Sequence, residues 1–260
     1  MLLANHHCQP MICKASSFHQ IYISFGLMKL SDENPLDLAD LYEDDYFALR
    51  IGNDDKRLEA FRLERRFMER NANLEGTCCD VGCSTGEFLQ FLEWSGPMFG
   101  LEISKFAIKK AEEKGIKIIP DPKNAPDLDV VIFRGTVQHL DNPFKCIENL
   151  VQALKPDGKL FFLATPNAGS IYYRLFQDLP ALDEPRNFYI PSYRSLKSIM
   201  KIYGFDCIDE EFPYWQSPYS SPILDISKFS GKLLLSLLRL DHREIQFPFF
   251  GSMMNLCSAG

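Results

Sequence analysis

The segment from Cys79 to Leu89 contains one acidic residue and two glycines in the pattern Asp-x-Gly-x-x-x-Gly, formed by Asp80, Gly82 and Gly86. Glycine adopts positive φ angles and lets a ligand lie against bare backbone. A helix that begins after the second glycine offers unpaired N–H groups. A dinucleotide site requires G-x-G-x-x-G instead, and a carboxylate before the turn would repel a diphosphate. The pattern therefore disfavours an NAD-dependent oxidoreductase and favours a ligand with ammonium and sulfonium charges, such as S-adenosylmethionine.

A second acidic residue, Glu102, lies 22 residues beyond Asp80 and follows the predicted strand Met98–Leu101. An acidic side chain at the end of a second strand can accept hydrogen bonds from both hydroxyls of a ribose, as it does in dinucleotide folds. An exposed glutamate is common at such a place. Combined with the glycine turn, it predicts a nucleoside site.

Short apolar runs alternate with amphipathic stretches from Thr77 onward, which is typical of βα units around a parallel sheet. The predicted strands are Thr77–Val81, Met98–Leu101, Ile116–Ile119, Val130–Phe133, Lys159–Thr165, Phe205–Ile208 and Phe249–Leu256. The predicted helices are 54–72, Gly86–Trp94, Lys105–Lys114, Pro143–Leu154 and one from the N-cap Ser192 to about Tyr203. We expect Lys155–Gly158 to form a turn between helix and strand.

These motifs resemble those of class I S-adenosylmethionine-dependent methyltransferases over roughly residues 75–210. The matching segments are Asp80–Gly86, Gly100–Ser104, Asp129–Phe133, Val137–Pro143, Leu154–Leu160 and Thr165–Asn167. The Thr165–Asn167 ending and the Phe249–Met254 tail look most like small-molecule methyltransferases of the ubiquinone pathway and of polysaccharide gene clusters. The resemblance implies an α/β, Rossmann-like, doubly wound, mostly parallel seven-stranded sheet with an antiparallel final strand.

The resemblance also implies a set of cofactor-binding residues. They are Asp80, Gly82, Cys83, Ser84, Gly86, Glu102, Ile103, Asp121, Arg134, Gly135 and Thr136. Asp121 would reach the adenine amine, although a solvated loop aspartate is an equal alternative. Two residues depart from the family pattern. Ser84 replaces the commonest glycine, which is tolerable if its φ is negative, and Gln138 replaces a frequent glutamate.

His139 is the candidate general base, because an alcohol or phenol acceptor must lose a proton during methyl transfer. The alternative, which we favour, is that His139 caps or packs the following helix. Candidate acceptor-binding residues are Tyr46, Asn167, Tyr172, Arg186 and Asn187. Tyr46 and Phe47 could also form a lid or simply pack. The expected acceptor is a small molecule, such as a sugar, glycan precursor or phenol, and the alternative function is an inactive binding module.

The 260-residue chain has a formal net charge of −7, which argues against a nucleic-acid partner. Its eight cysteines form no disulfide pattern and fit a reducing, cytoplasmic location. No apolar run reaches the roughly 20 residues of a membrane span. No cluster of carboxylates and histidines has the spacing of a metal site.

The sequence divides into three parts. We expect a disordered leader at 1–27, absent if Met28 is the start, an N-terminal helical or cap segment at 28–75 and a methyltransferase domain at 76–260. A helical insertion at about 217–246 contains the strongly apolar stretch 223–240. We favour a cap over the active site for this stretch. Peripheral membrane contact or an oligomer contact would give the same pattern.

Overall fold

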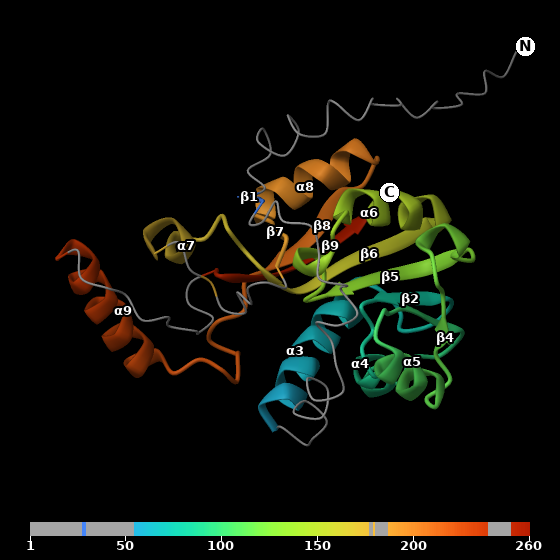
Figure 1. The fold of residues 1–260 in the computed structure, drawn as a ribbon, viewed down its shortest axis with the longest axis horizontal. Helices are drawn as coiled ribbons and strands as arrows, with labels where there is room; N and C mark the ends of the chain where they lie inside the picture. The colour runs from blue at the N-terminus through green and yellow to red at the C-terminus, as the bar shows by residue number, and fades with distance from the viewer. Residues whose placement is uncertain (1–27, 30–54, 177–178, 180–186, 239–250) are drawn as a thin grey trace, which may run out of the picture.

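The computed structural model describes residues 28–29, 55–176, 179, 187–238 and 251–260 (Figure 1). Its helices are α3 (Asp55–Asn71), α4 (Glu87–Phe91), α5 (Lys105–Glu112), α6 (Pro143–Ala153), α7 (Ile171–Phe176), α8 (Tyr193–Ile202) and α9 (Pro222–Leu237), with 3₁₀ turns η3 (Pro122–Asn124) and η4 (Val137–His139). Its strands are β1 (Met28–Lys29), β2 (Cys78–Val81), β3 (Met98–Leu101), β4 (Lys117–Ile118), β5 (Leu128–Arg134), β6 (Leu154–Pro166), β7 (Tyr189–Ile190), β8 (Asp206–Glu211) and β9 (Met253–Ala259).

Seven strands form one sheet in the order β4-β3-β2-β5-β6-β9-β8. The pairs from β4 to β6 are parallel, whereas β9 is antiparallel to both of its neighbours. Helices α3, α4 and α5 cover one face of the sheet, and α6 and α8 cover the other (Figure 1). The predicted doubly wound, mostly parallel sheet with an antiparallel final strand is therefore confirmed. A separate short ladder pairs β1 with β7.

Several predicted boundaries need correction. The last strand is β9 at Met253–Ala259 and not Phe249–Leu256, and Phe249 lies outside the described residues. Helix α4 ends at Phe91, short of Trp94, because Glu93 has a φ of 54° that ends a right-handed helix. The expected turn at Lys155–Gly158 is instead an irregularity within β6, where the pairing with β5 shifts register.

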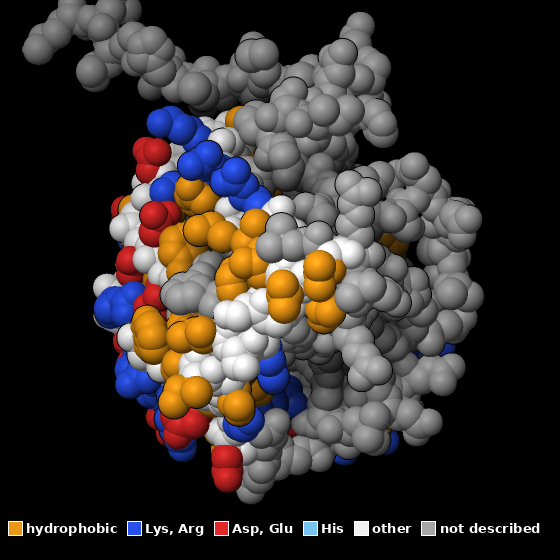
Figure 2. All heavy atoms as spheres, turned by 90° about the vertical axis from the view of Figure 1, so that its left-hand side faces the viewer, with side chains coloured by type: hydrophobic (Ala, Val, Ile, Leu, Met, Phe, Trp, Pro, Cys, Tyr) orange, Lys and Arg blue, Asp and Glu red, His pale blue; other side chains and the backbone are white. Residues whose placement is uncertain are grey.

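Helices α7 and α9 lie away from the sheet, beyond the end at which β6 finishes (Figure 1). Polar groups fix α9 in place. Asp225 accepts a hydrogen bond from the Tyr214 hydroxyl at 3.0 Å, and the Lys232 ammonium lies 3.4 Å from the Tyr172 hydroxyl of α7. Hydrophobic side chains gather on the outer surface at this end of the molecule (Figure 2).

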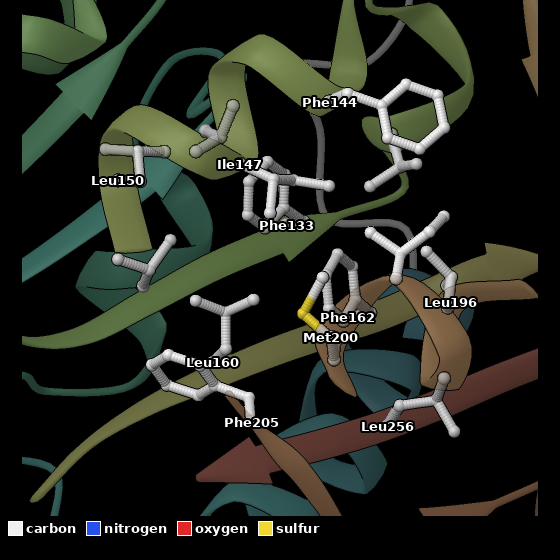
Figure 3. Close-up of a cluster of buried hydrophobic side chains, with 14 of the residues drawn as sticks. Phe133, Phe144, Ile147, Leu150, Leu160, Phe162, Leu196, Met200, Phe205 and Leu256 are labelled. Carbon is white, nitrogen blue, oxygen red and sulfur yellow. The ribbon is translucent and has the colours of Figure 1, made fainter. Parts of the chain in front are cut away.

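The central strands are buried on both faces, so neighbouring residues serve two different cores. On β5, Val131 and Phe133 pack with α6 and α8, whereas Val130 and Ile132 pack with α3 and α4. Figure 3 shows the first core, in which Phe133 of β5 stacks on Phe162 of β6 with ring centroids 5.1 Å apart. This packing fixes the strands whose ends carry the candidate site.

The cysteines from Cys78 to Cys257 are six free thiols, four of them buried, and Cys8 and Cys13 lie outside the described residues. Burial raises the pKa of Cys146 and of Cys257 to about 12. Both thiols therefore stay protonated near neutral pH and pack as small apolar groups.

Candidate active site at the carboxyl ends of the strands

The strand register brings three separate segments together. Val81 of β2 lies opposite Leu101 of β3 on one side and Phe133 of β5 on the other. The next residues along the chain after Val81, Leu101 and Phe133 are Gly82, Glu102 and Arg134. Their adjacency agrees with the rule that open parallel sheets bind ligands at the carboxyl ends of their strands.

Asp80 lies within β2 and is 2% exposed. Its Oδ1 atom is buried and has no hydrogen-bond partner among the described residues. A buried carboxylate oxygen without a partner is unfavourable. Burial raises the pKa of Asp80 to about 7, against the lowering effect of the Arg134 guanidinium, and Glu102 and Glu64 raise it further. Asp80 is therefore suited to receive a cationic group from a ligand.

The turn after β2 has positive φ angles at three residues, namely 70° at Gly82, 53° at Ser84 and 76° at Gly86. The positive φ of Ser84 contradicts our expectation of a negative one, and it places a strained non-glycine residue in the turn. A Cβ on Gly82 would lie 2.7 Å from the Thr136 side chain, and one on Gly86 would lie 2.3 Å from Ile116. Both glycines thus also serve close packing.

Glu102 faces this turn. Its Oε2 accepts a hydrogen bond from the Ser84 N–H at 2.9 Å, and its Oε1 accepts from the N–H groups of Ile103 and Ser104 at 2.8 and 3.0 Å. A carboxylate has about four acceptor positions, so one remains for a ligand hydroxyl. Ile103 is about half exposed beside it. Cys83 is buried, and its Sγ packs closely on Gly100, so only its backbone contributes to the turn.

Glu64 of α3 is a residue of this region that the sequence analysis missed. It is 5% exposed and binds Arg134 through two contacts, Arg134 Nε to Oε2 at 2.5 Å and Nη2 to Oε1 at 3.2 Å. The guanidinium lies over the Phe61 ring, 4.4 Å from its centroid, and also over Phe88. Arg134 therefore fastens α3 to the end of β5. A glutamate on the apolar face of α3, between Phe61 and Phe67, was the sequence signal.

The segment after β5 turns back through Gly135, whose φ is 59°. The buried Thr136 donates its hydroxyl to Arg134 O at 3.0 Å. Gln138 Nε2 donates to Gly135 O at 2.9 Å and lies 3.3 Å from His139 Nε2. Because an amide nitrogen only donates, His139 Nε2 is the acceptor in that contact. Gln138 therefore contacts the His139 ring, whose role stays a prediction.

The other predicted site residues make contacts of their own. The side chain of Asp121 accepts from the Lys123 N–H at 2.9 Å and caps η3. Asn167 is buried, accepts from the N–H groups of Gly169 and Tyr193, and donates to Gly251 O. Tyr172 is completely buried beneath Lys232.

The polar groups of Asn167 and Tyr172 make contacts within the fold, and their role in binding the acceptor stays a prediction. Asn187 is 1% exposed, so its side chain likewise belongs to the interior. Tyr46 and Arg186 lie outside the described residues. An open cavity of about 550 Å³ lies at the opposite end of the sheet, between Arg65, Leu74 and Ser95. No cluster of three or more metal-ligating side chains is found within the described ranges.

A family model described as a methyltransferase domain matches residues 54–210. The fold is similar to that of an S-adenosylmethionine-dependent methyltransferase from Archaeoglobus fulgidus, with a TM-score of 0.54, 21% identity, and coverage of 84% of this chain and 100% of that one. It is also similar to magnesium protoporphyrin IX methyltransferase from Synechocystis PCC 6803, with a TM-score of 0.51, 13% identity and 94% of both chains covered. No curated protein sequence matches the chain. This family match spans more than half of the chain. The chain therefore belongs to the methyltransferase-domain family.

Proposed function

We propose that this methyltransferase uses S-adenosylmethionine bound at the turn after β2 and transfers its methyl group to a hydroxyl of a small-molecule acceptor. The observation that carries the proposal is the buried Asp80 oxygen that lacks a hydrogen-bond partner among the described residues. Such a group is compensated when a ligand supplies a cationic donor. S-adenosylmethionine has both an ammonium group and a sulfonium centre, and it supplies the activated methyl group when bound.

Three features of the chain fit the rest of the cofactor. Gly82 leaves bare backbone at the turn, where any Cβ would meet Thr136. The acceptor position that remains on Glu102 fits one ribose hydroxyl, while its other contacts hold the turn in shape. The Arg134–Glu64 pair links α3 to the end of β5, and the Arg134 guanidinium acts against the rise in the pKa of Asp80. These residues bind and orient, which is most of what methyl transfer requires of a protein.

A hydroxyl acceptor must also lose its proton. His139 Nε2 accepts a contact from Gln138, so a base role at that atom requires the Gln138 amide to move away. We therefore assign His139 a positioning role, with the acceptor hydroxyl losing its proton to solvent or to another group. A sugar, a glycan precursor and a phenol are the acceptor classes to examine.

Calorimetry with S-adenosylmethionine tests the proposal directly, with Asp80→Asn as the variant and Asp129→Asn as its matched control at the opposite end of the sheet. Removing one partner of a buried charge contact costs about 2 kcal/mol or more, so we expect Asp80→Asn to weaken binding roughly thirtyfold. Asp129→Asn should bind as the wild type does. Equal binding by all three proteins, or binding of NADH in place of S-adenosylmethionine, would contradict the site.

Turnover with sugar and phenol acceptors then separates an enzyme from a binding module on the same fold. We expect formation of S-adenosylhomocysteine that depends on the acceptor. Tight cofactor binding without turnover over a broad acceptor panel would favour the binding module.

A further inference from the structure

Helix α9 has the reverse of the usual amphipathic arrangement. Two of its three charged residues, Asp225 and Lys232, are 2% and 4% exposed, whereas Ile223, with 86% exposure, points outward. Leu224, Ile226, Leu234 and Leu235 of α9 are also exposed, as is Leu238 directly after the helix. A surface helix of a soluble domain normally buries its apolar stripe and exposes its charges. This helix does the opposite.

The inward-facing polar residues hold α9 in this orientation. Asp225 accepts hydrogen bonds from the Tyr214 hydroxyl at 3.0 Å and from the Ser221 N–H at 2.8 Å. About two turns further on, the Lys232 ammonium lies 5.4 Å from the centroid of the Tyr172 ring. Rotating the helix to bury its leucines would break these contacts. The outward apolar surface is therefore a fixed feature.

The apolar surface continues onto neighbouring segments. Ile171 and Leu175 of α7 are exposed, as are Trp215 and Tyr219 in the segment that precedes α9. Figure 2 shows this end of the molecule, with hydrophobic side chains gathered on its surface and Lys and Arg side chains beside them. We call the exposed apolar residues of α7, α9 and 215–219 the outer patch. An exposed apolar area of this kind marks an interaction surface.

The charges and aromatic residues of the outer patch indicate its partner. Arg174 and Lys228 are the only exposed ionisable side chains on the described parts of α7 and α9, and both are cationic. Tryptophan and tyrosine favour the boundary between lipid and water. Cations beside apolar side chains attract anionic headgroups. A symmetric contact between the outer patches of two copies would instead bring the cations of one copy toward those of the other. The described parts of α7 and α9 expose no anionic side chain that would balance them.

We propose that the outer patch docks this protein on the surface of an anionic phospholipid bilayer. Docking would be peripheral, since none of the described helices has the length and hydropathy of a membrane-crossing segment. The carboxyl ends of the parallel strands point toward the side of the molecule on which α7 and α9 lie (Figure 1). Docking through the outer patch would therefore turn the candidate site toward acceptors held in the membrane.

Vesicle flotation with the full chain tests this proposal without cofactor or turnover, so its result is independent of the proposed function. We expect the protein to float with vesicles of phosphatidylcholine and phosphatidylglycerol and to stay behind with phosphatidylcholine alone. Combining Ile223→Ser, Leu224→Ser and Leu234→Ser should reduce the bound fraction roughly tenfold, because binding scales with buried apolar area. Combining Arg174→Gln with Lys228→Gln should remove the preference for anionic vesicles.

Ile202→Ser with Ile208→Ser is the control, because both side chains are exposed and lie on α8 and β8, outside the outer patch. This variant should float as the wild type does. Near-ultraviolet circular dichroism shows whether each variant keeps its fold. Absence of wild-type flotation overturns the proposal, as does equal flotation of the triple serine variant. A dimer in sedimentation equilibrium that the triple variant abolishes, without vesicle binding, would assign the patch to self-association instead.

Discussion

The two ends of strand β2 each meet an aspartate, and the two aspartates are in opposite states. At the amino end, Asp129 accepts hydrogen bonds from Lys155 at 2.8 Å and from the Thr77 N–H at 2.7 Å. These contacts lower the pKa of Asp129. Toward the carboxyl end, Asp80 is buried, one of its oxygens has no partner in the described part of the chain, and its pKa is raised to about 7. The first carboxylate is satisfied by the fold. The second keeps one buried oxygen without a hydrogen-bond partner among the described residues.

A glycine also lies at each end of β2, Gly76 before the strand and Gly82 after it. Gly76 has a φ of 85°, and a Cβ there would lie 2.5 Å from Asp129 Oδ2. Gly82 has a φ of 70°, and its Cβ would meet Thr136. Positive φ and close approach therefore occur at both ends, so glycine geometry alone does not distinguish a ligand site from a structural turn. The unsatisfied carboxylate does.

The largest expected effect is on stability as a function of pH, and it belongs to Asp80. Its folded pKa of about 7 lies above its ordinary value of 3.8. Stability from the protonated form is thus fully present below about pH 4 and is lost as the pH rises through 7, in total roughly 4 kcal/mol. We expect Asp80→Asn to be more stable than the wild type at about pH 8.5 and similar at about pH 4, as measured by chemical denaturation.

Asp129→Asn provides the contrast in the same titration, because it should not be stabilised at high pH. Saturating S-adenosylmethionine should narrow the gap between the wild type and Asp80→Asn at about pH 8.5, since a ligand that binds only the folded state stabilises it. If wild type and Asp80→Asn have parallel stability curves over the whole range, Asp80 is not a buried titrating group.

The second prediction concerns the pH dependence of cofactor affinity. A cationic ligand binds the ionised form of Asp80, so the affinity for S-adenosylmethionine should fall as the pH drops below about 7. The full decrease should approach the roughly thirtyfold loss expected for Asp80→Asn. Calorimetry across this range measures it, and the Asp80→Asn variant should show a flatter profile. A wild-type affinity that stays constant from about pH 8 to pH 5.5 would mean that the ionisation of Asp80 does not govern binding.

The sequence predicted this end of the sheet well for a physical reason. Parallel strands place their carboxyl ends together, so Asp80, Gly82 and Glu102 could be brought to one site from spacing alone. Glu64 was missed because its role depends on how α3 packs against β5, which the sequence shows only as a charge on an apolar face. The internal contacts of Asn167 and Tyr172 likewise depend on tertiary packing, which the sequence does not show. The positive φ of Ser84 also depends on tertiary contacts, since its N–H donates to Glu102 from the neighbouring strand end.

The third prediction separates crowding from backbone strain at the two glycines. Gly82→Ala should cost about 1 to 2 kcal/mol through the positive φ, with a further contribution from contact with Thr136. Gly115→Ala is the matched control, because Gly115 has a φ of 81° and nothing within 4 Å of its Cβ position. Gly76→Ala should destabilise the fold while leaving cofactor affinity unchanged. Thermal unfolding and calorimetry check both expectations, and a loss of affinity in Gly76→Ala equal to that in Gly82→Ala would remove the distinction between the two ends.

The smallest expected effect belongs to Asp129. Its lowered pKa contributes stability that is present above the ordinary value near 4 and is lost as the pH falls through the lowered one, opposite in sign to Asp80. The pair with Lys155 is partly exposed, with side-chain exposures of 44% and 35%, so solvent screens it. We expect Asp129→Asn to cost less than about 1 kcal/mol at neutral pH, and less still in high salt. Denaturation at two salt concentrations measures this difference. A cost at neutral pH as large as the Asp80 effect would mean that solvent does not screen the Asp129–Lys155 pair.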